Sequence, residues 1–249
     1  MIPHSLKLRA RDMARLVGLE VSPSNLYSRF DLRLVELLNI KQARFLLDVG
    51  ANRGQFASEI LKAGFEGTVI SFEALPQVYQ ELLASASAFG ERWVVAPRAA
   101  LSDFDGNVSF NVTKNFVSSS LLQPTDYMLN ESEQLTILET IQVPTKRLDD
   151  LVGSLELSEG SFFLKLDVQG AEHLVLAGAR ETLRRSAGAL LEVHLVDYYE
   201  GQASWKQLDA IMTSNGLSLW DVHPVLRDGY GRLEAMDIVY VRSDDTRPQ

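Results

Sequence analysis

The stretch RFLLDVGANRGQF, residues 44–56, predicts a strand, a glycine turn and the start of a helix. Residues 45–49 are almost all apolar, which is typical of a parallel strand that is covered on both faces. The turn begins at Gly50 and ends at Gly54, and the predicted helix then carries apolar side chains on one side. Such a unit forms the first half of a nucleotide-binding βαβ fold. Gly50 lets a ligand approach the backbone because it has no Cβ atom, and the helix start offers free N–H groups to a polar or anionic group.

The spacing of the glycines narrows the class of ligand. The turn reads G-x-x-x-G, whereas dinucleotide-binding folds use G-x-G-x-x-G and phosphate-binding loops contain G-K-S/T. A turn of this kind, with Asp48 near the end of the strand, is typical of methyltransferases that use S-adenosylmethionine (SAM). The next predicted strand ends in Glu73, at the roughly 20-residue spacing of a carboxylate that binds a ribose. The alternatives are a turn without a ligand and a helix-capping role for Glu73.

Composition and charge exclude several classes of protein. The chain has 249 residues, 46% of them hydrophobic and 23% charged, and these values are typical of one sizeable globular domain or two small ones. A net charge of −9 without a basic run disfavours a nucleic-acid partner, and the lack of cysteine excludes disulfides and thiolate metal sites. No apolar stretch reaches the length of about 18 residues that a membrane span requires, and the N-terminus lacks a signal-peptide pattern. We therefore expect a cytoplasmic protein.

From residue 44 onward, predicted strands and helices alternate, which indicates an α/β fold of parallel strands joined by crossover helices. Residues 108–112 alternate like a half-buried strand, and residues 141–144 could pair beside them. The last two predicted strands should form an antiparallel edge of the sheet. The predicted strands are 44–49, 68–73, 92–96, 161–166, 188–194, 217–222 and 236–242, and the predicted helices are 27–39, 54–63, 76–88, 170–176 and 203–215.

We predict one main domain at residues 44–242, with three further segments. Residues 1–43 form an N-terminal helical cover, in which the first 20 residues are either a covering helix or a surface-contact arm. Residues 113–138 exceed the length of about 12–15 residues beyond which loops are usually functional or disordered. They predict a lid or substrate loop, with a plain insertion as the alternative. Residues 243–249 are a polar tail.

Ligands of open α/β sheets bind beyond the carboxyl ends of the strands. Asp167, at one such end, could bind the methionine part of SAM, hold a metal or cap the helix that follows. Lys165, on the same buried strand, needs a partner or a route to water. Glu192 and His194 alternate onto one face, and His194 is our candidate general base because a neutral imidazole can accept a proton near pH 7. The same rule brings together Asp48, Gly50, Asn52, Glu73, Asp167, Glu192 and His194.

Seven segments, in order, resemble the FkbM family of SAM-dependent methyltransferases. The resemblance implies a Rossmann-like class I methyltransferase fold, with a seven-stranded, mostly parallel sheet and helices on both faces. It also implies O-methylation of a sugar-containing acceptor, such as a glycolipid or polysaccharide, or of a secondary metabolite, with S-adenosylhomocysteine (SAH) as the product. The segments are DVGANRGQF (48–56), VISFEALPQVYQELL (69–83), AALSDFDGNVSF (99–110), SSSLL (118–122), VPTKRLDDLV (143–152), FLKLDVQGAEHLVLAGA (163–179) and LLEVH (190–194).

The resemblance also implies which residues bind the cofactor. Two positions depart from the family pattern: Ala74 replaces a common proline, and Gln169 replaces a common glutamate. The second departure puts metal binding in doubt, and we expect no metal. The implied positions are Asp48, Gly50, Asn52 and Gly54 at the methionine end, with Phe56 in the same motif, Glu73 at the ribose, Ala74 and Leu75 near the adenine, Ser102 and Asp103 near its amino edge, and Asp167 in the cleft.

The expected partner is a small-molecule or glycan hydroxyl acceptor, and the chain could form a homo-oligomer. Two alternatives stay open. A non-catalytic SAM-binding or scaffold protein would keep the cofactor site for stability. A nucleotide-sugar oxidoreductase is the other, and the glycine spacing and the lack of a Tyr-x-x-x-Lys pair argue against it.

Overall fold

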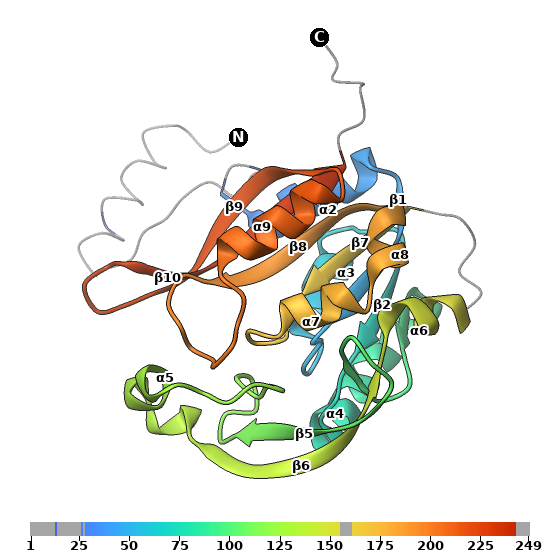
Figure 1. The fold of residues 1–249 in the computed structure, drawn as a ribbon. Helices are drawn as coiled ribbons and strands as arrows, with labels where there is room; N and C mark the ends of the chain where they lie inside the picture. Colours follow the sequence, from blue (N-terminus) through green and yellow to red (C-terminus); the bar gives the residue numbers. More distant parts are fainter. Residues whose placement is uncertain (1–12, 14–25, 27, 155–160, 243–249) are drawn as a thin grey trace.

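The computed structural model describes residue 13, residue 26 and residues 28–154 and 161–242 (Figure 1). The predicted helix within the first 20 residues and the tail at 243–249 lie outside the described residues. The main strands are β1 (Ala43–Val49), β2 (Thr68–Phe72), β3 (Trp93–Val95), β7 (Ser161–Leu166), β8 (Ser186–His194), β9 (Leu217–Arg227) and β10 (Leu233–Arg242). The helices are α2 (Phe30–Ile40), α3 (Gln55–Lys62), α4 (Pro76–Ser87), α5 (Asp126–Glu131), α6 (Leu148–Ser154), α7 (Glu172–Ala177), α8 (Arg180–Arg185) and α9 (Trp205–Ser214), with short 3-10 turns η1 (Gly90–Arg92) and η2 (Glu133–Leu135).

These strands form one seven-stranded sheet in the order β3-β2-β1-β7-β8-β10-β9. The neighbours from β3 to β8 pair in parallel, and β10 pairs antiparallel with both β8 and β9. The predicted mostly parallel sheet with an antiparallel edge is confirmed. The carboxyl ends of β1, β2 and β7 therefore meet at one edge of the sheet.

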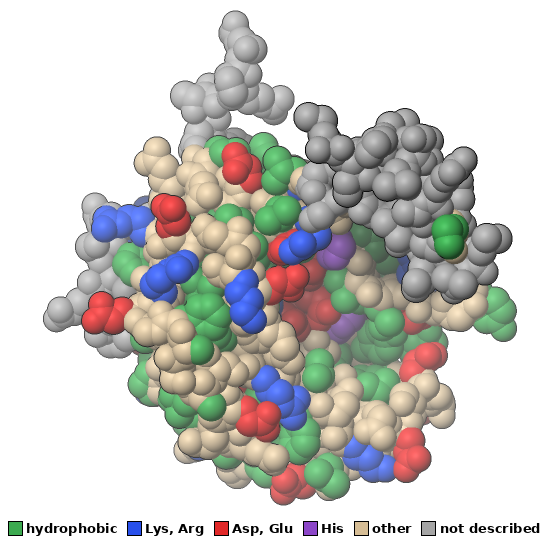
Figure 2. All heavy atoms as spheres, turned by 180° about the vertical axis from the view of Figure 1, so that it is seen from behind, with side chains coloured by type: hydrophobic (Ala, Val, Ile, Leu, Met, Phe, Trp, Pro, Cys, Tyr) green, Lys and Arg blue, Asp and Glu red, His purple; other side chains and the backbone are tan. Residues whose placement is uncertain are grey.

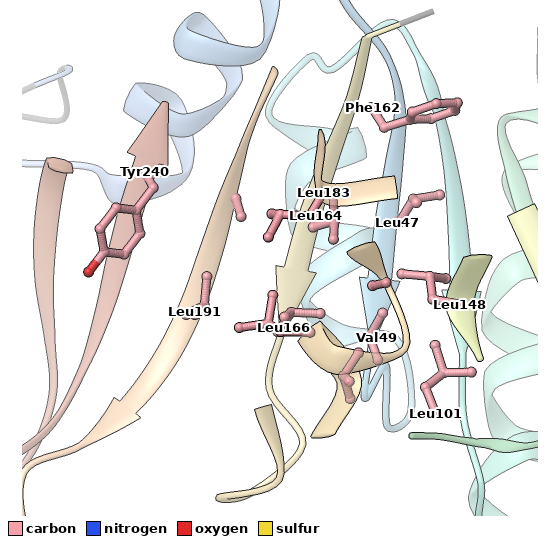
Figure 3. Packing of buried hydrophobic residues seen from close by; sticks show 14 of the residues in the cluster. Leu47, Val49, Leu101, Leu148, Phe162, Leu164, Leu166, Leu183, Leu191 and Tyr240 are labelled. Atoms are coloured by element: carbon pink, nitrogen blue, oxygen red, sulfur yellow. The ribbon is translucent and has the colours of Figure 1, made fainter. Parts of the chain in front are cut away.

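Helices cover both faces of the sheet because the side chains of each strand alternate between two apolar clusters. Leu46 and Leu190 belong to the cluster that packs against α2, α3 and α4. Leu47 and Leu191 belong to the other cluster, which packs against α6, α7, α8 and α9. Figure 3 shows this second cluster between the strands and the helices that cover them. Two covered faces explain why the strand segments are almost continuously apolar.

A second, three-stranded sheet lies beside the carboxyl ends of the main strands (Figure 1). Its strands are β4 (Ala100–Leu101), β5 (Gly106–Thr113) and β6 (Ile137–Lys146), in the order β4-β6-β5. The predicted pairing of the two extended segments is confirmed, since β5 and β6 are antiparallel with Phe110 opposite Ile141. The chain between them carries α5 and η2, so the predicted lid or substrate loop contains a short helix and a 3-10 turn.

The hairpin of β9 and β10 is longer than predicted. The sequence predicts a strand that ends at residue 222, before Pro224, but β9 continues to Arg227 and pairs His223 with Asp237. Proline is tolerated at this position because β9 is the edge strand, where an N–H that points outward needs no ladder partner. No helix of the described residues is long and apolar enough to cross a membrane.

Candidate active site

A buried lysine holds the turn that follows β1. Lys165 Nζ donates to the carbonyl of Gly50 at 3.2 Å and lies 3.3 Å from Asp48 Oδ1 and 3.2 Å from Asp167 Oδ2. Asp48 and Lys165 are partners in the β1–β7 register, so their side chains share one face. Burial alone would lower the pKa of Lys165, but the carboxylates of Asp167 and Asp48 raise it above its usual value. Lys165 therefore has the partners that a buried ammonium group requires.

The two glycines of the turn are required by contacts within the protein. Gly50 has a φ of 76°, and a Cβ atom there would lie 1.8 Å from the backbone oxygen of Asp167. Gly54 has a φ of 86°, and its Cβ atom would lie 2.4 Å from the ring of Trp93. Gly50 also lines the first cavity, and its role in letting a ligand approach the backbone stays a prediction. The close approach of the chain after β7 already excludes any larger residue.

Glu73 ties the turn after β1 to the loop after β2. Its carboxylate accepts hydrogen bonds from the backbone N–H groups of Asn52, at 2.9 Å, and of Ala74 and Leu75, both at 2.8 Å. Burial raises the pKa of Glu73, and these three N–H groups oppose that rise. A carboxylate offers about four lone-pair sites. Glu73 therefore keeps acceptor capacity for the hydroxyl groups of a ligand.

A cavity opens beside Glu73 at the carboxyl ends of β1, β2 and β7. Most of its polar groups come from the loops after β1, β2 and β7, and many of its apolar groups come from β4, β5 and the chain that follows β5. This division suits a molecule with an apolar base, a polar ribose and a charged tail, so the residues present fit SAM. The lining includes the predicted residues Gly50, Asn52, Glu73, Ala74, Leu75 and Asp167, together with Leu101, Phe110, Phe116, Val117 and Gln169.

Three predicted cofactor residues of the first motif lie behind this wall. Asp48 is fully buried and accepts a hydrogen bond from Ser71 Oγ at 3.1 Å. The ring of Phe56 lies 5.4 Å from Lys165 Nζ. Gly54 starts α3 on the far side of the turn. These positions let the three residues shape the turn, while direct contact with a cofactor stays a prediction.

Ser102 and Asp103 also lie outside the cavity wall. Their neighbours Ala100 and Leu101, which form β4, line it instead. Ser102 is buried with its backbone against α7, since a Cβ atom at Gly178 would lie 2.0 Å from the Ser102 oxygen. Asp103 is exposed. Ala100 and Leu101 therefore form this part of the wall, and a contact of Ser102 or Asp103 with the adenine stays a prediction.

A second cavity adjoins the first, and Gln169 and Val117 line both. Figure 2 shows acidic and histidine side chains around a hollow on this side of the molecule. The wall combines residues that end β8, the segment between β5 and β6, and the tip of the β9–β10 hairpin. Among its residues are Ser118, Glu131, Glu192, His194, Tyr198, Tyr199, Arg227, Asp228 and Glu234.

Gln169 joins the two cavities, and the sequence identified it only as a departure from the family pattern. Its Nε2 donates to Asp167 Oδ1 at 2.8 Å and to Glu192 Oε2 at 2.6 Å. Its Oε1 accepts from the hydroxyl of Tyr199 at 3.0 Å, and its backbone oxygen accepts from Ser120 Oγ at 2.7 Å. The signal that could have found it is its place two residues beyond Asp167, in the loop that follows a strand end.

His194 ends β8 and lines the second cavity, as predicted from the alternation of this strand. Its ring contacts Tyr198 edge-on, at 5.0 Å between centroids, and its Nε2 lies 3.9 Å from Glu192 Oε2. Burial lowers the pKa of His194 to about 4. The imidazole is therefore neutral at pH 7 and can exchange hydrogen bonds with an acceptor. Its role as the general base stays a prediction.

The chain matches the family described as Methyltransferase FkbM domain over residues 48–219. It is 29% identical to the 2-O-methyltransferase NoeI of Sinorhizobium fredii, over 80% of this chain and 81% of that protein. It is 25% identical to Methyltransferase 1 of Beauveria bassiana over 54% of this chain, and it spans 57% of that relative.

Among solved structures, the chain is similar to the O-methyltransferase TomG from Streptomyces achromogenes, solved in complex with SAM. The TM-score is 0.46 at 12% identity, over 98% of this chain and 92% of that one. The family match, by contrast, extends from the end of β1 into β9, so it includes the wall of the first cavity and the part of the second cavity that precedes the tip of the β9–β10 hairpin. Because it covers well over half of the residues, the chain belongs to the FkbM family of methyltransferases.

Proposed function

We propose that the protein transfers the methyl group of SAM to a hydroxyl group of a sugar-containing or secondary-metabolite acceptor and releases SAH. The observation that carries the proposal is Glu73, a buried carboxylate at the end of β2 that lines a cavity between the glycine turn and an apolar wall. Membership of a methyltransferase family supports the reaction class and argues against the oxidoreductase alternative.

SAM, when bound, supplies a methyl group on a positively charged sulfur. Glu73 would accept the ribose hydroxyls, and the apolar wall formed by Leu101, Phe110 and Val117 would hold the adenine. Asp167 would attract the charged tail or the sulfur, since about 32% of its side chain is exposed and Lys165 and Gln169 orient it. These residues can bind and orient the methyl donor without a covalent contribution to the reaction.

The second cavity is our candidate for the acceptor site because it meets the first at Gln169. Its wall offers hydroxyl, amide and carboxylate groups, and the rings of Tyr198 and Tyr199 add flat apolar surface. This mixture suits a polyhydroxylated molecule, whose hydroxyl groups need many hydrogen-bond partners. The relative NoeI is a 2-O-methyltransferase by name, which supports an oxygen atom as the methyl acceptor.

Methyl transfer can be tested with SAM that is isotopically labelled in the methyl group. The protein is incubated with a panel of glycosides and natural-product hydroxyls, and the products are analysed by mass spectrometry. We expect the label on one hydroxyl of at least one acceptor, and Glu73→Ala should reduce the yield. A protein that binds SAM but labels none of these acceptors would favour the non-catalytic alternative.

We also predict that the transfer needs no added metal. Gln169 donates its amide hydrogens to the carboxyl groups of Asp167 and Glu192, so its side chain occupies the position between them where a cation could otherwise bind both. Among the residues that the structure describes, no group of three or more His, Asp or Glu side chains could hold a metal ion. Activity should be equal with EDTA and with Mg²⁺. A loss in EDTA that Mg²⁺ restores would make Asp167 the first residue to test as a metal ligand.

A further inference from the structure

We infer that Asp167 and Glu192 share one proton, that Glu192 loses it when the positive sulfur of SAM binds, and that Glu192 then accepts the proton of the acceptor hydroxyl. The inference rests on the proposed function. It concerns the junction of the two cavities, where a methyl donor in one and a hydroxyl in the other would meet. Gln169 marks this junction because it lines both cavities and donates one amide hydrogen to each carboxyl group.

The two carboxyl groups lie close together. Gln169 Nε2 lies 2.8 Å from Asp167 Oδ1 and 2.6 Å from Glu192 Oε2, so both oxygens are within hydrogen-bond distance of one nitrogen. Two ionised carboxylates at this separation repel each other, which favours one proton on the pair. The amide of Gln169 is neutral, so its hydrogen bonds do not remove the excess negative charge.

The surrounding charges decide which of the two carries the proton. Asp167 Oδ2 lies 3.2 Å from the ammonium of Lys165, which favours its ionised form. Burial would raise the pKa of Asp167, but Lys165 and the hydrogen bonds hold it below its usual value. Burial and the nearby carboxylates raise the pKa of Glu192 well above the usual range. The groups that face the pair are Asp48 and Lys165 beside Asp167, and Glu172, His194, Tyr199 and Asp237 around Glu192.

A cation in the first cavity would change this balance. An opposite charge within about 4–6 Å lowers the pKa of a carboxyl group by roughly 1–3 units. The sulfur of SAM carries such a charge and that of SAH does not. Glu192 should therefore release its proton to solvent when SAM binds and keep it when SAH binds.

The reaction would then return the proton to the same group. As the oxygen of the acceptor bonds to the methyl carbon, the carbon–sulfur bond breaks and its electron pair stays on the sulfur. The O–H bond of the acceptor breaks in the same step, and its proton passes to the carboxylate of Glu192. The positive charge on the sulfur is gone at this point, so Glu192 is again most stable in its protonated form.

Glu192 is better suited than His194 to this task. The pKa of His194, about 4, makes its imidazole a weak proton acceptor. Its Nε2 lies 3.9 Å from Glu192 Oε2, close enough for both side chains to reach one hydroxyl group. We therefore assign proton transfer to Glu192 and the orientation of the acceptor hydroxyl to His194.

Isothermal titration calorimetry tests the proton release directly and needs no acceptor. SAM and SAH are titrated into the full chain at pH 6.5 in buffers of different ionisation enthalpy, because the dependence of the heat on the buffer counts the protons released. At this pH the α-amino group of either ligand is mostly protonated, since its pKa lies near about 8. We expect SAM to release more protons than SAH, by up to about one. Equal numbers for the two ligands would overturn the inference.

Two variants assign the proton to one residue. Glu192→Gln should bind both ligands and release equal numbers of protons with SAM and with SAH. His194→Gln should keep the greater proton release with SAM. Glu192→Gln should lower the rate of turnover by a factor of about 10²–10⁴. In His194→Gln, the plot of kcat/KM against pH should keep its fall on the acid side at the same pH as in the wild type. If the difference in proton release between SAM and SAH persists in Glu192→Gln and disappears in His194→Gln, His194 is the group that releases the proton, and the inference is contradicted.

A measurement on the wild-type protein keeps the test valid if Glu192→Gln does not fold. The ratio of the dissociation constants of SAM and SAH should fall as the pH rises from 5.5 to 7.5, by up to about tenfold per pH unit. A ratio that does not change with pH would contradict proton release. If neither ligand binds at all, the proposed function fails instead, so the two failures are distinct.

Discussion

Among single residues, Glu73 combines a structural role with its proposed role in binding. It accepts three backbone hydrogen bonds from the two loops that form the cavity wall. Its removal would leave these N–H groups without their acceptor next to the proposed cofactor site. We expect the fold to survive the loss of this carboxylate, at a cost in stability.

We predict that Glu73→Ala weakens SAM binding by about 1.5–3 kcal/mol, which is roughly a 10- to 150-fold increase in Kd, because a hydrogen bond to a charged group is lost. The free energy of unfolding should also fall, by about 1–3 kcal/mol, since buried N–H groups lose their acceptor. Calorimetry and urea unfolding measure the two effects. Exposed Glu91, replaced by alanine, is the control. Unchanged affinity in folded Glu73→Ala would remove this residue from the site.

The pKa of His194 predicts a dependence of stability on pH. Burial lowers this pKa from 6.5 to about 4, so between these values the unfolded chain binds a proton that the folded chain does not. The contribution of His194 to stability is therefore present above pH 6.5 and is lost as the pH falls toward 4. Urea unfolding of the wild type and of His194→Gln should show a smaller loss in the variant between pH 6.5 and pH 4.5, by about 1–3 kcal/mol. If the free energy of unfolding changes with pH in the same way in the wild type and in His194→Gln, His194 does not take up a proton on unfolding.

Among the secondary-structure elements, the segment that carries α5 connects the small sheet to the main one. The hydroxyl of Tyr127 on α5 and that of Tyr198 both donate to the buried carboxylate of Glu234 on β10. Thr125 Oγ1 donates to the backbone oxygen of Asp197 at 2.7 Å, and Met128 packs among the residues of the same loop. The predicted lid is thus fastened to the loop after β8. Opening of the second cavity would require both segments to move together.

We predict that Tyr127→Phe loosens both segments. Without its hydroxyl, α5 loses a hydrogen bond to a carboxylate, so hydrogen exchange should become faster in residues 122–135 and also in residues 195–202. The matched control is Tyr230→Phe, because Tyr230 is fully exposed at the tip of the hairpin. Faster exchange in only one of the two segments would show that they open independently. Binding of an acceptor should slow exchange in both.

For the molecule as a whole, the first cavity lies between the main sheet and the small sheet, and the second lies between the main sheet and the segment that joins β5 to β6. Ligand binding should therefore stabilise the fold as one unit. At a concentration of about 100 times Kd, a ligand that binds only the native state adds about 2.7 kcal/mol. For a domain of this size that corresponds to a rise in Tm of roughly 5–10 °C. We expect this rise with SAM and SAH and none with NAD. A rise with NAD and none with SAH would end the methyltransferase proposal.

Much of the fold follows from short patterns within the chain. The apolar runs of β1, β2, β7 and β8 each predict a strand that is covered on both faces. The glycine turn comes directly after β1 and Glu73 directly after β2, so the predicted ends of the strands also place these residues. Parallel strands bring their carboxyl ends together, so Asp167 and His194 could be placed at one edge without knowledge of the strand order. The predicted pairing of β5 with β6 succeeded for a similar reason, since both strands show a simple period and adjoin one long connection.

The contacts of Gln169 with Glu192 and Tyr199 could not be predicted in this way. Glu192 and Tyr199 lie 23 and 30 residues after Gln169 in the chain, and they meet it only because β8 lies beside β7. The bond of Tyr127 with Glu234 joins residues 107 positions apart. Such contacts depend on the strand order and on the path of long connections, which no local period encodes. Local pattern was therefore enough to bring together the residues of the first cavity, where we propose that SAM binds, and only the packing of distant segments formed the second cavity and the carboxyl pair where we place the proton.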